Sequence, residues 1–209
     1  MIDEVIRMLE IELDTIDAIA VSGGPGSFTG LRIGSATAKG LGLAMKKPLI
    51  HVPTVDAMAY NLYGTDALIC RLWTPEEIRL YTGLYHFREE FEIVKEQQPA
   101  DIKELVEELN GRGERVIFLG DGVPPYQAVI EELIKVPHRF APAHVNRQRA
   151  ASVAALGSVY LAEGKTETAM EHKPDYLRKS QAERERELAE RQGELDKLAA
   201  GIQVVEKQA

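Results

Sequence analysis

The sequence predicts an α/β fold, because short apolar runs typical of strands alternate with amphipathic or alanine-rich segments typical of helices. Two junctions between a predicted strand and a predicted helix carry glycine turns, at residues 23–26 and 120–122. Glycine is common at such reversals because it adopts positive φ without steric cost. A chain of 209 residues allows one large domain or two small ones, with ample apolar core.

Residues 16–45 are predicted to form a strand, a turn and a helix. Residues 16–21 are mostly β-branched or small and apolar, which is typical of a strand buried on both faces. After the glycine turn, the side chain of Ser27 or Thr29 can cap a helix whose first N–H groups need partners. We expect the helix to end near Met45, because two lysines and a proline follow.

The predicted helix is rich in glycine, with Gly30, Gly34, Gly40 and Gly42 in its interior. Each glycine costs roughly 0.5–1 kcal/mol relative to alanine in a helix. Gly30, Gly34 and Ala38 recur at helical spacing, so one face has almost no bulk. We therefore expect a strand or helix, of this chain or of a partner, to approach that face closely and offset the cost.

A glycine turn before a helix also suggests phosphate binding, because helix N-termini attract anions. The stretch lacks the Gly-Lys-Ser/Thr ending of a P-loop and the G-x-G-x-x-G pattern of dinucleotide-binding proteins. A tight structural turn is the favoured interpretation, and an anion site is the alternative.

The segments on either side continue the alternation. An amphipathic helix is predicted over residues 1–12, before the central stretch. We expect Thr54 to cap the next helix and Asn110–Gly111 to end the one after it. The later predictions are strands over residues 48–52, 66–70, 80–87 and 116–119, a hairpin strand over 92–95, and helices over 54–63, 101–109, 126–134 and 147–162.

The string GPGSFTGLRIG, residues 24–34, closely resembles the corresponding motif of the TsaB (YeaZ-like) family. The resemblance continues through residues 51–57, 81–85 and 176–184, and it covers most of the chain. The family-motif residues are Gly24, Pro25, Gly26, Ser27, Phe28, Thr29, Gly30, Arg32 and Gly34.

This resemblance implies an actin-like fold of two related α/β halves. Residues 1–64 would be the remainder of the first half, residues 65–179 the second half, and residues 180–209 a polar helical tail. In the family, three strands precede the first helix, so the resemblance implies that the first half is incomplete here. Met1 would then be an internal methionine of a longer protein.

The resemblance further implies a structural, non-catalytic role. Family members bind a catalytic paralogue, TsaD, in the formation of threonylcarbamoyladenosine next to the tRNA anticodon, in a complex that includes a TsaE-type ATPase. The isolated chain could also form a homodimer. The partner interface is expected on the first helix and the glycine-rich helix, at Ile2, Val5, Ile6, Leu9, Gly30, Gly34, Ala38 and Leu41.

Residues 71–79 depart from the family pattern, which has a strand leading into Asp-Ala-Arg-Arg at this point. A change of reading frame across the segment would restore a close match. We hypothesise two compensating frameshifts, real or from sequencing. The alternative is a divergent loop in which Trp73 is a mildly exposed aromatic residue without a role.

The composition argues against direct tRNA binding, a disulfide-bonded fold and a membrane protein. The formal net charge is −8, whereas proteins that bind tRNA phosphates usually have a basic face, so tRNA contact is expected only through a partner. The single cysteine, Cys70, excludes an intramolecular disulfide and fits a reducing cytoplasm. No apolar stretch approaches the ~20 residues that span a bilayer, and no signal-peptide pattern is visible.

Catalytic and metal-binding patterns are not found in the sequence. The five histidines are scattered, with none four residues apart on a helix, so no metal site and no cofactor are predicted. Cys70 lacks the sequence context of a nucleophile. Two alternatives remain open: an independent nucleotide-binding enzyme of the actin superfamily that uses the turn at Gly120, and a non-functional fragment.

Overall fold

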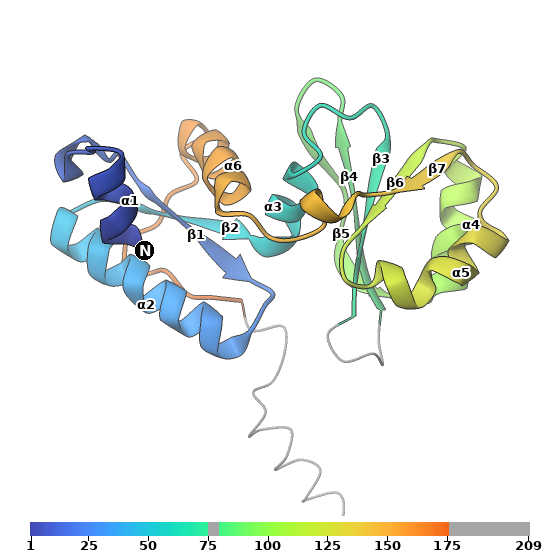
Figure 1. Ribbon diagram of the computed structural model, residues 1–209, viewed down its shortest axis with the longest axis horizontal. Coiled ribbons are helices and arrows are strands. Elements are labelled where there is room, and N and C mark those ends of the chain that lie inside the picture. The colour runs from blue at the N-terminus through green and yellow to red at the C-terminus, as the bar shows by residue number, and fades with distance from the viewer. Residues whose placement is uncertain (75–79, 176–209) are drawn as a thin grey trace, which may run out of the picture. The chain divides into compact units, whose positions relative to one another are not determined.

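A computed structural model of the chain describes residues 1–74 and 80–175, which form two β-sheets with helices on their faces (Figure 1). Strands and helices alternate along most of this part, so the predicted α/β class is confirmed. Residues 1–175 form one compact unit, and the boundary expected between residues 64 and 65 stays a prediction. The tail expected over residues 180–209 lies outside the described residues.

The elements are labelled in chain order in Figure 1. The first sheet and the segments around it comprise α1 (Ile2–Met8), the 3₁₀ turn η1 (Leu13–Thr15), β1 (Ile19–Gly24), α2 (Phe28–Met45), β2 (Leu49–Pro53), α3 (Thr54–Tyr60) and α6 (Ala150–Ala162). The second sheet and its helices comprise β3 (Leu68–Trp73), β4 (Leu80–Phe87), β5 (Phe91–Ala100), α4 (Ile102–Arg112), β6 (Val116–Leu119), α5 (Val123–Leu133), β7 (His138–Phe140) and the 3₁₀ turn η2 (Ala143–Val145).

The first sheet consists of β1 and β2, which are parallel and paired from Ile19 opposite Leu49 onwards. Side chains of successive residues point to opposite faces, and each face has its own core. Leu49 packs with Ala38 of α2, whereas Ile50 packs with Leu156 of α6. Accordingly, α2 and α6 lie on opposite sides of this sheet in Figure 1. The other edge of β1 has no partner among the described strands. Residues of β1 and α6, such as Ala20 and Gly157, line a cavity of about 580 Å³.

The second sheet has the strand order β5-β4-β3-β6-β7. β4 is antiparallel to both β3 and β5, and β6 is parallel to both β3 and β7. One face packs against α4 and α5 through residues such as Leu105 and Ile130. The opposite face packs against α3, where Met58 contacts Ile69 and Leu119.

Several predicted boundaries are confirmed. The strands over residues 80–87 and 116–119 match β4 and β6, and α2 ends at Met45 with Lys46 in the left-handed conformation. The hairpin strand is present as β5 but is longer than expected, because it pairs with β4 as far as Ala100 opposite Leu80.

Other boundaries were wrong. α1 ends at Met8 rather than near residue 12, with Glu10 at a positive φ just beyond it. α4 runs past Asn110–Gly111 to Arg112, because Gly113 supplies the left-handed residue that ends a helix. Thr54 does not cap α3, since its hydroxyl pairs with that of Ser22 at 2.6 Å. The three-residue strand β7 was not predicted.

Strand β3 continues through Trp73, although the sequence predicted its end at Cys70. Arg71, in the part of the chain that departs from the family pattern, is buried between its strand neighbours. Its guanidinium carbon lies 5.5 Å from the ring centroid of Trp73, and that ring lies 5.4 Å from the ring of Tyr81. Trp73 is therefore partly exposed, as the divergent-loop alternative expected, but it lies in a strand and makes ring contacts. Residues 75–79 lie outside the described part, and the frameshift stays a hypothesis.

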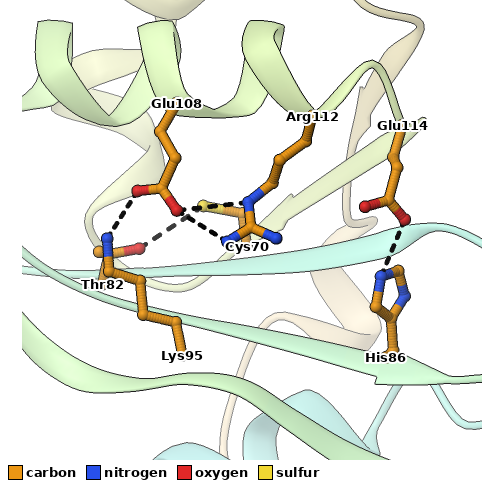
Figure 2. Close-up of polar contacts among 7 residues, drawn as sticks. All are labelled: Cys70, Thr82, His86, Lys95, Glu108, Arg112 and Glu114. Atoms are coloured by element: carbon orange, nitrogen blue, oxygen red, sulfur yellow. Dashed lines mark hydrogen bonds and ion pairs between the residues drawn. The ribbon is translucent and has the colours of Figure 1, made fainter.

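Figure 2 shows the charged groups beneath α4 and at the neighbouring end of β4. Lys95 of β5 donates a hydrogen bond to Glu108 at 2.6 Å, and Arg112 donates one at 2.9 Å. Burial acts to raise the pKa of Glu108, but the hydrogen bonds from these cations outweigh it, so this pKa lies below its usual value. A second pair joins His86 of β4 to Glu114, 2.9 Å apart.

We expect Glu108→Gln to lower the free energy of unfolding at neutral pH by roughly 1 kcal/mol, because it removes the charge that both cations contact. A carboxylate with a lowered pKa stabilises the fold above its unfolded pKa, near 4.3, and this effect is lost as the pH falls through the folded pKa. The difference between wild type and variant should therefore shrink below about pH 4 in urea unfolding. The control is Glu107→Gln, on the exposed side of α4. A difference that does not change with pH would contradict this explanation.

Candidate functional site: the glycine turn and an exposed apolar surface

The turn at the end of β1 is fixed by close approaches that leave no room for a side chain. A Cβ on Gly23 would lie 2.0–2.6 Å from ring atoms of His51. A Cβ on Gly24, whose φ is +125°, would lie 2.5 Å from the main-chain oxygen of Asp175. Asp175 also donates its main-chain N–H to the oxygen of Gly23 at 2.7 Å. The segment ending at Asp175 therefore packs onto the turn, and the fold requires both glycines.

The rest of the family motif forms the start of α2. A cis peptide bond joins Gly24 to Pro25. Of the two candidate caps, Ser27 is the one used, since its hydroxyl accepts a hydrogen bond from the N–H of Gly30 at 3.3 Å. The guanidinium carbon of Arg32 lies 5.3 Å from the ring centroid of Phe28. These contacts support the interpretation of the motif as a structural turn and helix cap, and the anion site stays an alternative.

Helix α2 has two different faces. The inner face, which includes Ala38 and Gly42, packs on the first sheet, and a Cβ on Gly42 would lie 3.0 Å from the side chain of Leu49. The outer face is exposed and carries large apolar side chains, with 63% of Ile33 and 58% of Leu43 accessible to solvent. The helix has only two charged residues, both cations, among its 18 residues. An outer face of this composition is typical of a surface that binds another protein.

Helix α1 adds further exposed apolar side chains. It buries none of its residues, and 52% of Val5 and 63% of the adjoining Leu9 are accessible to solvent. Isolated helices shorter than ~12–15 residues are marginal in water, and α1 has seven residues. We use the term apolar helix residues for the exposed apolar side chains of α1, of its C-cap and of α2: Ile2, Val5, Met8, Leu9, Ile33 and Leu43.

The structure divides the predicted interface residues into three groups. Ile2, Val5, Leu9 and Gly30 are exposed, and Ile6, Gly34 and Leu41 are half-buried. Ala38 is only 5% exposed and belongs to the chain's own core, so we do not count it in the surface.

Sequence reasoning missed Met8, Ile33 and Leu43. The near-absence of charge around the whole of α2 is the signal that could have found the last two.

The glycines of α2 also fall into two groups. A Cβ on Gly34 or Gly40 would meet nothing within 4 Å in the described chain, whereas Gly42 is in close contact with the sheet. Packing within this chain therefore explains Gly42 but neither Gly34 nor Gly40.

A second candidate site is a cavity of about 340 Å³ near the turn at Gly120, lined by residues that include Arg71, Asp121 and Arg147. The need for glycine in this turn has a structural cause, because φ of Gly120 is +111° and a Cβ would lie 2.1 Å from the main-chain oxygen of Leu72. Gly120 is therefore explained by the geometry of the turn, and it does not by itself indicate nucleotide binding. Within the lining of the cavity, burial lowers the pKa of Arg71 to about 10.

A buried polar network surrounds Asp56 of α3, which is 5% exposed. Tyr85 donates a hydrogen bond to its carboxylate at 3.1 Å, and Tyr160 donates one at 3.4 Å. Burial raises the pKa of Asp56 to about 6, and the two hydrogen bonds oppose this shift only in part. The network joins α3 to β4 and α6.

The single cysteine is in unfavourable surroundings for catalysis. Cys70 is fully buried, and burial raises the pKa of its thiol to about 12, so it is not a nucleophile at neutral pH.

His51, Glu167 and His172 approach one another beside the glycine turn and could hold a metal ion. No helix within residues 1–74 and 80–175 is long and apolar enough to span a bilayer.

The two glycine environments of α2 predict opposite effects of one substitution. Gly34→Ala should raise the free energy of unfolding by about 0.5–1 kcal/mol, because the added methyl group improves helix propensity and meets nothing. Gly42→Ala should be less stable than Gly34→Ala by about 1 kcal/mol or more, because its methyl group overpacks against Leu49. Denaturant unfolding of the two variants and the wild type measures this order. Equal stabilities for the two variants would show that the inner face tolerates a side chain.

The raised pKa of Asp56 predicts a pH dependence of opposite sign to that of Glu108. The ionised carboxylate is the disfavoured form in the fold, so its contribution to stability is largest below the unfolded pKa, near 3.9, and is lost as the pH rises to about 6. Relative to Asp56→Asn, the wild type should therefore lose about 2–3 kcal/mol of unfolding free energy over this range. Urea titrations of both proteins test this, and parallel pH profiles would show that Asp56 does not titrate as described.

Comparisons with known proteins place the chain in a family. A protein-family model described as "TsaD: tRNA N6-adenosine threonylcarbamoyltransferase" matches residues 1–186. The Bacillus subtilis protein named "tRNA threonylcarbamoyladenosine biosynthesis protein TsaB" is 30% identical over 171 residues, 80% of this chain and 72% of that protein. The Escherichia coli protein of the same name is 30% identical over 193 residues, 87% of this chain and 79% of that protein.

Solved structures agree on the fold. The YeaZ structure from Pseudomonas aeruginosa has a TM-score of 0.61 at 19% identity, covering 84% of this chain and 81% of that one. A second structure, described as similar to the peptidase YeaZ of Pseudomonas aeruginosa, has a TM-score of 0.68 at 21% identity, with 85% and 81% covered. At such identities the likeness shows a shared fold alone. Taken with the sequence matches, these findings show that the chain belongs to the TsaB (YeaZ-like) family, with its actin-like α/β fold.

Proposed function

We propose that this chain is a structural, non-catalytic subunit in the formation of threonylcarbamoyladenosine in tRNA, and that it activates a TsaD-type catalytic subunit by binding it. The names of the TsaB relatives that match most of the chain support the pathway. Relatives named as tRNA N6-adenosine threonylcarbamoyltransferases match shorter stretches, for example 43% identity over 60 residues in Protochlamydia amoebophila. This likeness supports a pair of related subunits, one of which performs the chemistry.

The apolar helix residues are the observation that carries the proposal. α1 is too short to be stable by itself and fully buries none of its residues in the described chain, so a partner that covers it would supply the missing burial. On α2, Gly34 and Gly40 lower helix propensity without any close neighbour in the described chain. A helix of another protein can approach such residues closely, as at many helix–helix contacts. Apolar side chains of a TsaD-type subunit would then pack between Val5, Leu9 and Ile33.

The electrostatics fit an accessory role. With a formal net charge of −8, the chain would repel tRNA phosphates, so tRNA would contact the partner rather than this subunit. Cys70 is buried with a raised pKa, which argues against a cysteine-nucleophile hydrolase.

Further parts of the proposal rest on the resemblance alone. We place the complex in the cytoplasm and include a TsaE-type ATPase in it. When the partner is absent, the same apolar helix residues could join two copies of the chain. The three further strands expected beside β1 stay a prediction.

The experiment measures binding and stability on the same variants. Val5→Glu, Leu9→Glu and Ile33→Glu place a charge on exposed positions, so each should leave the unfolding free energy within about 0.5 kcal/mol of the wild type. Affinity for the TsaD-type subunit of the same organism, measured by calorimetry, should fall at least tenfold, because a charge would be buried without a partner. The matched control is Ile93→Glu on the edge strand β5, which is also exposed.

Unchanged affinity in all three variants would overturn the interface, even if the complex forms. Formation of threonylcarbamoyladenosine in a reconstituted reaction with TsaD- and TsaE-type proteins tests the function separately. If the isolated chain instead turned over ATP steadily, and Asp121→Asn abolished the turnover, the nucleotide-binding alternative at the Gly120 cavity would be favoured.

A further inference from the structure

Two histidines and a glutamate meet beside the glycine turn, although they are far apart in the sequence. His51 lies in β2, and Glu167 and His172 lie in the segment that follows α6. One ring nitrogen of each histidine and one carboxylate oxygen of Glu167 all lie within 4.8 Å of one another. His172 is completely buried, whereas His51 and Glu167 are partly accessible to solvent.

Main-chain hydrogen bonds hold these residues in place. Glu167 and Leu49 exchange N–H···O bonds of 2.9 Å in both directions, so the glutamate is fixed next to β2. The N–H of His172 donates to the oxygen of Thr168 at 3.1 Å. The positions of the three side chains therefore come from backbone that the fold already orders.

The polar contacts within the group leave one atom unsatisfied. Nδ1 of His172 pairs with the carboxylate of Glu167, and Nε2 of His51 lies 3.0 Å from a carboxylate oxygen of Asp175. Nε2 of His172 is buried and has no hydrogen-bond partner in residues 1–74 and 80–175. A buried polar atom without a partner costs about 1–3 kcal/mol. Two hydrogen-bonded histidine–carboxylate pairs alone would not explain why the imidazole of His172 is buried in this way.

We propose that His51, Glu167 and His172 bind a divalent transition metal ion of the zinc class. Two imidazoles and one carboxylate form a common ligand set for zinc, with metal–ligand bonds of about 2.0–2.2 Å. Tetrahedral ligands at that bond length are about 3.3 Å apart, so the widest separation in the group has to shorten by at most about 1.5 Å. Asp175 would orient the ring of His51, as carboxylates often do for ligating histidines.

The site has a structural role in this proposal. The ion would tie the segment of residues 167–175 to β2 and to the turn at Gly23, where a side chain larger than hydrogen would collide with the ring of His51. The ion would therefore stabilise the turn from which α2 begins. The sequence-based expectation of no metal considered only the spacing of histidines along helices, and ligands brought together by folding have no such spacing.

The test uses the full chain without a polyhistidine tag, freed of metal by a chelator. Competition of Zn²⁺ with a chromogenic chelator should give one ion per chain. His51→Asn and Glu167→Gln should each weaken zinc binding at least tenfold, and Asp175→Asn about tenfold. The matched control is His144→Asn, an exposed histidine outside the group, which should bind zinc as the wild type does. Co²⁺ should give the visible absorption of a tetrahedral site in the wild type and lose it in Glu167→Gln.

Circular dichroism of the metal-free variants establishes that they fold, and the partly exposed positions 51 and 167 were chosen for that reason. Zinc should also raise the thermal midpoint of the wild type and the control but not of the two ligand variants. No binding by the wild type at micromolar zinc would overturn the proposal. Undiminished binding by the double variant His51→Asn/Glu167→Gln would overturn it equally.

Discussion

The end of β1 has to accommodate three neighbours at contact distance, and much of the structure depends on how it does so. The ring of His51 lies against Gly23, the main chain of Asp175 lies against Gly24, and α2 begins at Phe28, four residues later. Only glycine leaves the space for the first two contacts. The turn thereby fixes the start of α2, and hence which of its side chains point to the sheet. It also fixes the path of the segment that carries Glu167 and His172.

Helix α2 illustrates how one element can serve both folding and recognition. Its glycines make it a weak helix by propensity, so its stability must come from packing. The inner face obtains that packing from β1 and β2, where Ala38 and Gly42 allow a close approach. The outer face, with Ile33 and Leu43, is left exposed. Because α2 has apolar residues on both faces, we attribute the burial of its outer face to a partner.

The sequence predicted elements well where the local pattern and the tertiary outcome agree. The alternation in residues 80–87 and the apolar run at 116–119 mark strands that pack against α4 and α5. The prediction of strands failed where pairing with a neighbouring strand determines the structure. β7 is a strand only because three residues lie beside β6, and β3 extends to Trp73 because β4 continues opposite it. At the candidate site, helical spacing identified Val5 and Leu9, but it could not separate the inner Ala38 from the outer Ile33. The meeting of His51 with His172 leaves no local signal at all.

The glycines of this chain also show how a motif should be weighed. Gly24 and Gly120 stand at strand-to-helix turns that resemble ligand-binding loops, yet in each case a main-chain oxygen of the chain itself occupies the space of the missing side chain. Such a glycine is fully explained by packing and says nothing about a ligand. Gly34 and Gly40 are the opposite case, because each weakens α2 and nothing in the described chain uses the space. Packing within the described chain therefore does not explain Gly34 and Gly40, and both lie on the helix whose outer face is apolar.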